Sequence, residues 1–410
     1  MHRLAGNRVL LCVGGGIAAY KAAEVVRRLL AAGADVQVAM TQAAREFITP
    51  LTLQALSRRP VATSLLDPGE DATIGHIKIA QDADAVLVAP ATADLIARMA
   101  AGMADDIVTA ALLVTRAPVV VAPAMNTHML SHPATARNIA ALASFGHRIV
   151  DSDHGELACG YEGLGRLPDP EVLLAELSAA LSPQDLTGVR VLVSAGPTRE
   201  PLDPVRYLTN RSSGRMGYAV AAAAWRRGAR VTLVSGPTSL AAPRGVERID
   251  VGTAAEMKKA LEAHADASDV IVMVAAVADY RPSRVAEAKI KKKAGEPMVL
   301  ELAENEDILA ALARRSSDAI VVGFAAETND VVRHGRDKLV RKGVDLIVAN
   351  DVTRAGAGFE TETNAAVLLD AAGEDEETGL VTKDELADRI LDRVVALRAR
   401  PRARRAVTSA

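Results

Sequence analysis

The sequence predicts an α/β protein built from two doubly wound parallel sheets in series, and three observations lead to this prediction. A strand, a glycine turn, a helix and a second strand follow one another from Arg8, and the same order starts again at Val189. Half of the residues are hydrophobic but only 2% are aromatic, a composition typical of parallel sheets that pack small aliphatic side chains against helices. The length of 410 residues suits two or three domains.

The first Rossmann-like unit is expected to begin with a strand over 8–13, the turn Gly14-Gly15-Gly16 and a helix over 17–32. A glycine turn at the start of a helix presents free backbone N–H groups to a phosphate. The turn matches part of the dinucleotide-binding pattern, but that pattern also requires an acidic residue at the end of the second strand. Asp35 lies at the start of that strand and Thr41 follows its end, so the sequence favours a mononucleotide over NAD.

Two later strands, over 85–89 and 118–122, run into loops that begin Pro90-Ala91-Thr92 and Pro123-Ala124-Met125. Open α/β sheets bind ligands at loops beyond the carboxyl ends of their strands. The segment 151–170 is expected to be a long loop, and loops of this length are usually functional or disordered. These three segments are therefore the candidate ligand-binding parts of the first unit.

Four motifs of the first unit follow one another in a specific order and spacing. They are Gly14-Gly15-Gly16-Ile17-Ala18, Gly75-His76-Ile77, Pro123-Ala124-Met125-Asn126-x-x-Met129 and Ala158-Cys159-Gly160. Together they resemble the flavin-dependent cysteine decarboxylases. The resemblance implies FMN as the cofactor, with contacts from Gly15, Gly16, Ile17, Ala18, Thr41, Pro90, Thr92, Ala93 and Met125.

The same resemblance implies three catalytic roles. His76 would help to activate the substrate, Asn126 would hold its carboxyl group, and Cys159 would donate a proton when the unsaturated product is reduced. Taken alone, a single histidine or cysteine is more often structural or inert. The four motifs in register favour the catalytic interpretation here.

The chain is expected to divide into a decarboxylase domain over 1–181, a linker over 182–188, a ligase domain over 189–398 and a basic tail over 399–410. Pro183 and the turn Asp185-Leu186-Thr187-Gly188 indicate the linker. The second domain opens like the first, with a buried strand, a loop rich in Gly, Pro, Asn and Ser, and a helix.

No stretch matches the Walker pattern G-x4-G-K-[ST]. A triphosphate would therefore bind on the hydroxyls and amides of Ser212-Ser213-Gly214, at the start of a helix expected over 216–227. Lys338 and Lys342 lie four residues apart on a predicted helix, so both can point at one anion, although an exposed helix face is the alternative. The run Lys291-Lys292-Lys293 follows Lys289 in a basic segment. The alternative to a functional role for this run is a solvated strand edge, where charge prevents strand pairing.

Six motifs of the second unit also occur in a specific order. They are Ser194-Ala195-Gly196-Pro197-Thr198, Asn210-Arg211-Ser212-Ser213-Gly214, Ala275-Ala276-Val277-Ala278-Asp279-Tyr280, Lys289-Ile290-Lys291-Lys292, Gly323-Phe324-Ala325-Ala326-Glu327-Thr328 and Ala349-Asn350-Asp351. Together they resemble phosphopantothenate–cysteine ligases. Both halves in this order resemble the bifunctional decarboxylase and ligase family of bacterial coenzyme A biosynthesis.

This resemblance implies CTP with Mg²⁺ or Mn²⁺, activation of 4'-phosphopantothenate as an acyl-cytidylate, and attack by the amine of cysteine. The product, 4'-phosphopantothenoylcysteine, would then be decarboxylated to 4'-phosphopantetheine. Arg206 and Asn210 would serve acyl-cytidylate formation, and Lys289 would stabilise charge, with the option of serving a neighbouring subunit. Asp279 is the candidate metal contact. The implied nucleotide and substrate contacts are Gly196, Ser212, Ser213, Gly214, Ala275, Ala276, Val277, Asp279, Asn305, Glu306, Asp307, Ile308, Phe324, Lys338 and Lys342. Glu306 and Leu130 depart from the family pattern.

The charge and composition of the chain argue against nucleic-acid binding and against a membrane span. A net charge of −3 gives no basic field for nucleic acid, and no apolar run reaches the roughly 18 residues of a membrane span. The two cysteines and the absence of a leader pattern predict a cytoplasmic protein without a disulfide framework. The resemblance implies a homo-oligomer in which decarboxylase trimers and ligase dimers combine as a dodecamer.

Two alternatives remain open from the sequence. One is a tandem NAD(P)-dependent oxidoreductase, which the displaced acidic residue Asp35 disfavours. The other is a non-catalytic flavin-binding regulatory protein, which the presence of both His76 and Cys159 disfavours.

Overall fold

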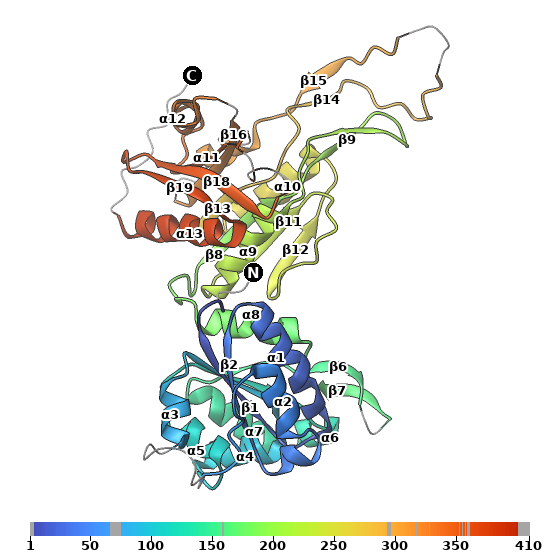
Figure 1. The fold of residues 1–410 in the computed structure, drawn as a ribbon. Helices are drawn as coiled ribbons and strands as arrows, with labels where there is room; N and C mark the ends of the chain where they lie inside the picture. The colour runs from blue at the N-terminus through green and yellow to red at the C-terminus, as the bar shows by residue number, and fades with distance from the viewer. Residues whose placement is uncertain are drawn as a thin grey trace. The chain divides into compact units, whose positions relative to one another are not determined.

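The computed structural model describes residues 4–65, 75–157, 160–292, 297–315, 318–327, 329–351, 353–354, 356, 358 and 361–400. The chain forms two compact units, Met1–Pro183 and Gln184–Ala410, called here the first and second unit. Each unit is built around one large parallel or mostly parallel sheet (Figure 1).

Five parallel strands form the main sheet of the first unit, in the order β2-β1-β3-β4-β5. The strands are β1 (Arg8–Val13), β2 (Asp35–Met40), β3 (Ala85–Ala91), β4 (Val119–Pro123) and β5 (Arg148–Ile149). Its helices are η1 (Ile17–Lys21), α1 (Ala22–Ala31), η2 (Ala43–Glu46), α2 (Pro50–Ser57), α3 (Gly75–Gln81), α4 (Ala93–Ala101), α5 (Ile107–Val114), α6 (Thr127–Ser131), α7 (Pro133–Ser144) and α8 (Pro170–Ala180).

Helices cover both faces of this sheet. Successive residues of a strand point to opposite faces, so each inner strand contributes side chains to two cores. Val9 and Leu11 of β1 pack in a core that includes side chains of α1, α2 and α8. Leu10 and Cys12 pack in a second core with α4, α5 and α7. The predicted doubly wound sheet is confirmed, and complete burial raises the pKa of the Cys12 thiol, as for an inert core residue.

Two features of the first unit differ from the sequence prediction. The predicted helix over 17–32 begins as the tight 3-10 turn η1 before it becomes α1. The predicted long loop over 151–170 was wrong in part, because it contains the antiparallel hairpin of β6 (Asp153–Glu156) and β7 (Glu162–Arg166). Three of the glycines that suggested a loop occupy strand positions: a Cβ atom would meet side-chain atoms at Gly155 and Gly163, and backbone at Gly165.

An eight-stranded sheet forms the second unit, in the order β12-β11-β8-β13-β16-β17-β18-β19. Its strands are β8 (Arg190–Ala195), β11 (Arg230–Ser235), β12 (Val246–Asp250), β13 (Val270–Met273), β16 (Ile320–Glu327), β17 (Leu346–Asp351), β18 (Thr363–Asp370) and β19 (Asp375–Thr382). The six strands from β12 to β17 are parallel as predicted, whereas β18 and β19 add an antiparallel edge that the sequence analysis did not predict.

Five helices of the described chain cover this sheet on both faces. They are α9 (Arg215–Arg226), α10 (Ala254–Ala265), α11 (Ile308–Arg315), α12 (Val331–Lys342) and α13 (Lys383–Ala399). Helices α9 and α13 contribute to one core, and α10, α11 and α12 contribute to the other. The carboxyl ends of β8, β13 and β16 thus share one edge of the sheet, where a ligand site is expected.

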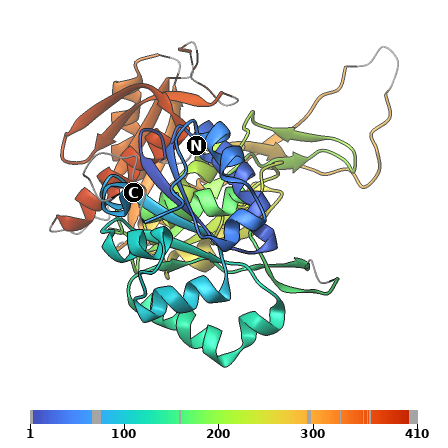
Figure 2. The same ribbon diagram turned by 60° about the horizontal axis from the view of Figure 1, so that its bottom comes forward.

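An arm of short strands leaves the second sheet. It consists of the described residues of 199–209 and 280–304, which contain the antiparallel pairs β9 (Arg199–Pro201) with β10 (Tyr207–Thr209) and β14 (Tyr280–Pro282) with β15 (Leu302–Glu304). Two views of the ribbon show β9, β14 and β15 extending away from the sheet (Figure 1, Figure 2).

Part of the segment predicted as a linker is packed against the second unit. Leu186 is fully buried, and Asp185 pairs with the buried guanidinium of Arg227. Independent folding of the domains within the predicted boundaries therefore stays a prediction. None of the described helices is long and apolar enough to cross a membrane.

Candidate functional site

Three strand ends meet at the glycine turn of the first unit. The amide of Gly14 donates a 3.0 Å hydrogen bond to the carbonyl oxygen of Pro90 in β3. A Cβ atom on Gly14 would lie 2.5 Å from that oxygen, and one on Gly15 would lie 2.3 Å from the Cβ of Ala43, which follows β2. Only backbone can line this turn, which suits the close approach of a phosphate.

The two threonines predicted to contact FMN lie beside this turn. Thr92 caps α4, since its Oγ1 accepts a 3.2 Å hydrogen bond from the amide of Leu95. Thr41 is buried, and its Oγ1 accepts a 3.2 Å hydrogen bond from the amide of Ala44. A hydroxyl that accepts a hydrogen bond can still donate its own hydrogen. The other predicted contacts Gly16, Ile17, Ala18 and Ala93 lie in the same turn, in η1 or at the start of α4.

The β6–β7 hairpin is fastened to the loop that carries Met125 and Asn126. The amide of Met125 donates a 3.0 Å hydrogen bond to the carbonyl of Gly165, and Thr127 Oγ1 donates a 2.7 Å hydrogen bond to the carbonyl of Leu164. A Cβ on Gly165 would lie 2.0 Å from the Met125 oxygen, so no larger residue fits. The side chain of Asn126 caps α6. Both predicted residues, Met125 and Asn126, therefore lie at the base of the hairpin.

His76 lies in the first turn of α3, and its Nδ1 is buried without a hydrogen bond to any described residue. A buried polar atom without a partner is uncommon in a folded protein, so this nitrogen fits contact with a bound molecule. Cys159 and Ala158 lie outside the described residues, and the role predicted for Cys159 stays a prediction.

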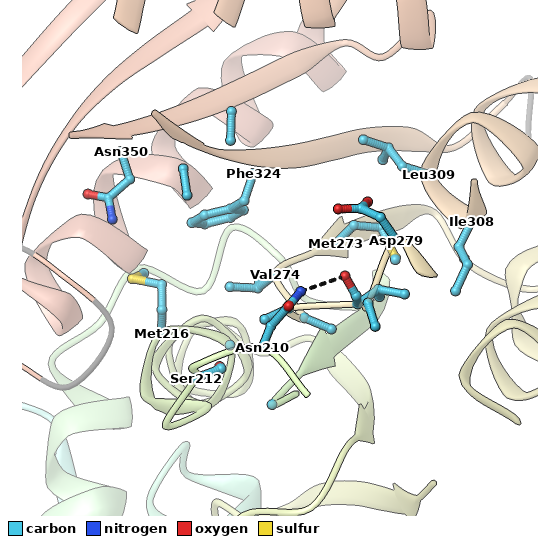
Figure 3. Close-up of a pocket in the computed structure, with 18 of the residues that line it drawn as sticks. Asn210, Ser212, Met216, Met273, Val274, Asp279, Ile308, Leu309, Phe324 and Asn350 are labelled. Carbon is cyan, nitrogen blue, oxygen red and sulfur yellow. Dashed lines mark hydrogen bonds between the residues drawn. The ribbon is translucent and has the colours of Figure 1, made fainter. Parts of the chain in front are cut away.

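A cavity of about 1130 Å³ opens in the second unit, at the edge formed by the carboxyl ends of β8, β13 and β16. Side chains of several elements face it, among them Ser212, Asp279 and Phe324 (Figure 3). Every residue predicted to contact the nucleotide lines this cavity, as does Asn210. The structure thus brings together positions that span more than half of the unit's sequence.

Two buried hydroxyls hold the wall of this cavity that follows β13. Ser194 Oγ accepts 3.1 Å hydrogen bonds from the amides of Val274 and Ala275, and Thr198 Oγ1 accepts one of 3.0 Å from Ala278. The side chain of Asn210 donates a 3.0 Å hydrogen bond to the carbonyl of Val277 (Figure 3), and that of Asn305 donates a 2.8 Å hydrogen bond to the carbonyl of Ala278. These bonds hold the backbone of residues 274–278.

The start of helix α9 forms the opposite wall. Gly214 adopts a left-handed conformation with φ of +77° just before the helix, and its amide donates a 3.2 Å hydrogen bond to Ser212 Oγ. A Cβ on Gly217 would lie 2.5 Å from the Cβ of Ala195, so glycine allows the helix to touch strand β8. The first amides of α9 and the hydroxyls of Ser212 and Ser213 therefore share one side of the cavity.

Positive charge enters the cavity from helix α12. Lys338 donates a 2.8 Å hydrogen bond to the carbonyl of Phe324, and burial lowers the pKa of its amine. Lys342 forms an ion pair with Asp307. Glu306 pairs with Lys258 on α10, and this hydrogen bond lowers the pKa of the glutamate. The departure at Glu306 is thus compensated within the unit.

Two predicted residues are absent from the described lining of the cavity. Arg206 pairs with the buried carboxylate of Asp203 at 2.6 Å, and Lys289 is exposed on the arm. No local pattern indicates that Asp203 is the partner of Arg206, because the interaction depends on how the arm folds.

Several lining residues were not predicted to bind a ligand. They include Met216, Asn350, Asn364 and Lys383. Asn350 ends strand β17, so the rule of strand carboxyl ends would have found it. Asn364 and Lys383 belong to β18 and α13, and no local pattern marks them. Among the described residues, no group of three or more His, Cys, Asp or Glu side chains is placed to hold a metal ion.

Comparisons with known proteins agree in both units. Residues 1–182 match the family described as flavoprotein, and residues 186–397 match the family described as the C-terminal domain of DNA/pantothenate metabolism flavoproteins. The chain is 52% identical over 393 residues to a Vibrio cholerae protein named coenzyme A biosynthesis bifunctional protein CoaBC, covering 95% of this chain and 98% of that protein. Proteins of the same name from Escherichia coli and Bacillus subtilis are 51% identical over 396 residues and 48% identical over 398 residues. These matches cover 96% of this chain in both cases, and 97% and 98% of the two relatives.

Proposed function

This chain belongs to the family of bifunctional coenzyme A biosynthesis proteins named CoaBC, and we propose that each of its two units carries one of two successive reactions. The second unit joins 4'-phosphopantothenate to cysteine. The first unit decarboxylates the product, 4'-phosphopantothenoylcysteine, to 4'-phosphopantetheine. The match of each unit to its own family supports this division of labour.

The first unit matches the flavoprotein family, and FMN is its proposed flavin. Bound FMN supplies the oxidation that lets the carboxylate leave and the later reduction of the product. The turn Gly14–Gly16 admits a phosphate because no side chain occupies it. His76 offers an unpaired buried nitrogen to the substrate, and Asn126 lies fixed at the base of the hairpin. Cys159 is the proposed proton donor.

The second unit is proposed to bind CTP in its large cavity. The start of α9 carries the positive end of the helix dipole and free amides, which suit a triphosphate. Lys338 and Lys342 add positive charge from α12. Mg²⁺ or Mn²⁺ would be held by Asp279, phosphate oxygens and water, since Mg²⁺ commonly takes one or two carboxylates and completes its shell this way. Among the described residues no three such side chains are grouped to hold the ion by themselves, so phosphate oxygens and water would have to complete its shell.

Lys289 is proposed to act in a neighbouring subunit. It is exposed on the arm and lies outside the described lining of its own cavity. Large apolar side chains are also exposed along the arm, including Val205, Tyr207, Tyr280 and Val285. Exposed apolar side chains gathered on one element are typical of an interface. We therefore propose ligase dimers through the arm and, with decarboxylase trimers, a dodecamer in the cytoplasm.

The observation that carries the ligase proposal is the single cavity that gathers every predicted nucleotide contact. The ligase proposal is tested by measuring the rate of CMP release at saturating CTP. Lys289→Gln should slow the release by about two to three orders of magnitude, because one donor that stabilises developing charge is worth about 2.7–4 kcal/mol. Lys291→Gln and Lys292→Gln are matched controls, since solvated lysines contribute little. Equal, mild losses in all three variants would reduce the segment to a diffuse anion-attracting patch.

The decarboxylase proposal is tested by the spectrum of the purified chain. A yellow protein that releases FMN on denaturation is expected. A colourless protein that binds NAD instead would favour the oxidoreductase alternative.

A further inference from the structure

We propose that Asp203 is a positioning residue for the ligase reaction, because it fixes the main chain of the arm on which Lys289 lies. This inference rests on the proposed ligase function. It concerns Asp203, Arg206 and the segment 286–290, which are here named the clasp.

The carboxylate of Asp203 is the centre of the clasp. Its side chain is fully buried, with 0% exposure, although it lies in a short loop between β9 and β10. Its Oδ1 accepts hydrogen bonds from the amides of Val205, at 2.8 Å, and Arg206, at 2.9 Å. Its Oδ2 accepts from the Arg206 guanidinium, at 3.0 and 2.6 Å, and from the amide of Ile290, at 3.0 Å. One carboxylate therefore joins its own loop to a segment far along the chain.

The clasp holds the arm on both sides of Lys289. On one side, the Ile290 amide is bound by Asp203, and the Ile290 carbonyl accepts a 2.6 Å hydrogen bond from Arg206 Nη2. On the other side, the amide of Ala286 donates a 3.0 Å hydrogen bond to the carbonyl of Leu202. The backbone at Lys289 lies between these two anchors, so its direction of exit from the arm is fixed.

The chemistry of Asp203 suits a permanent anchor. Burial alone would raise the pKa of this carboxyl, but the hydrogen bonds from Arg206 and from the amides of Ile290, Val205 and Arg206 lower it well below its usual range. Asp203 therefore ionises more readily than an ordinary aspartate. A charged acceptor makes stronger hydrogen bonds than a neutral one.

Positioning matters here because a lysine has a long and flexible side chain. An exposed ammonium loses little interaction energy when it moves, so its own contacts cannot fix its position. A displacement of about 1 Å in a reacting group can cost about 10²-fold in rate. Loss of the clasp should therefore act on turnover through Lys289, with little effect on the cavity proposed to bind CTP, whose described lining includes neither Asp203 nor Arg206.

A double-mutant cycle on the full-length protein tests this inference, with CMP release as the readout. Asp203→Asn should lower kcat by about 10- to 100-fold and leave KM for CTP within about twofold. In the Lys289→Gln background, the same change should cost less than about threefold, because its effect passes through a side chain that is already gone. Asp370→Asn is the matched control: Asp370 is also fully buried, pairs with Arg393 at 3.0 Å and accepts amide hydrogen bonds at 2.9 and 3.1 Å. It should leave kcat within about twofold.

Multiplicative losses in the double variant would show that Asp203 does not act through Lys289, and an equal loss in Asp370→Asn would show a general effect of losing a buried carboxylate; either result overturns the inference. Should Asp203→Asn fail to fold, Asp203→Ser enters the same cycle with the same criteria, because a serine hydroxyl can still accept from the amides of its own loop but does not supply the second oxygen that binds Ile290 and Arg206. A wild-type protein that releases no CMP would instead contradict the ligase function itself, so the two failures are distinguishable.

Discussion

Replacing Ser194 with alanine should both destabilise the second unit and weaken its use of CTP. Ser194 is fully buried at the end of β8, and its Oγ holds the amides of Val274 and Ala275 at 3.1 Å each. Each amide left without a partner costs about 1 kcal/mol, at the low end of the usual range because both residues are partly exposed. The expected loss in the free energy of unfolding is therefore about 2 kcal/mol.

The single tryptophan, Trp225, makes this loss measurable in the second unit alone, because it lies in α9. With a urea m-value of about 1–3 kcal/mol per M, the midpoint of the fluorescence transition should fall by about 0.7–2 M. The concentration of CTP at half-maximal rate should rise by about tenfold, because the loosened cavity wall must be ordered again on binding.

Ser235→Ala is the matched control for this prediction. Ser235 is equally buried on the neighbouring strand β11, where its Oγ bonds to the carbonyl of Gly236 at 2.8 Å and lies 3.0 Å from the hydroxyl of Tyr218. It should lower the urea midpoint without changing the dependence on CTP. An unchanged midpoint in Ser194→Ala, or the same CTP dependence in both variants, would show that the hydroxyl does not hold this wall.

Three further predictions concern single side chains. His76→Asn should keep its flavin absorbance and lose CO2 release; loss of flavin would make His76 a cofactor-binding or structural residue. Cys159→Ser should still release CO2 but accumulate an unsaturated product, and a wild-type yield of 4'-phosphopantetheine would exclude Cys159 as the proton donor. Lys338→Met should raise the half-saturating CTP concentration and abolish a pH effect on stability. Because burial lowers the pKa of Lys338, the unfolded wild type binds more protons as the pH approaches the ordinary lysine value of 10.5, so wild-type stability rises there. Equal pH slopes in urea unfolding of both proteins would contradict this.

The sheets of both units could be predicted because their strands are nearly uniform aliphatic runs between glycine turns and amphipathic helices. The rule that ligands meet the carboxyl ends of parallel strands also predicted the loops after β3 and β4 as ligand-binding segments. Both inferences depend on the local pattern of residues, which the sequence contains, and on the general right-handedness of βαβ connections.

The rest depended on contacts between distant segments. The β6–β7 hairpin could not be predicted, because Gly163 and Gly165 suggested a loop. In the structure these glycines allow β7 to approach Thr127 and Met125 closely. Asn364 and Lys383 reach the cavity only through the antiparallel edge β18–β19 and the placement of α13. The partnership of Arg206 with Asp203 and Ile290 likewise follows from the fold of the arm.

The central claim is that one chain performs both reactions in sequence, and carbon balance in a single reaction mixture tests it most directly. The full-length protein is given CTP, Mg²⁺, 4'-phosphopantothenate and cysteine labelled with ¹⁴C in its carboxyl group. Labelled CO2 and CMP should appear in equal amounts, with CO2 lagging behind CMP and absent when CTP is omitted. Release of CMP without labelled CO2, or of neither product, would show that the chain does not perform both reactions.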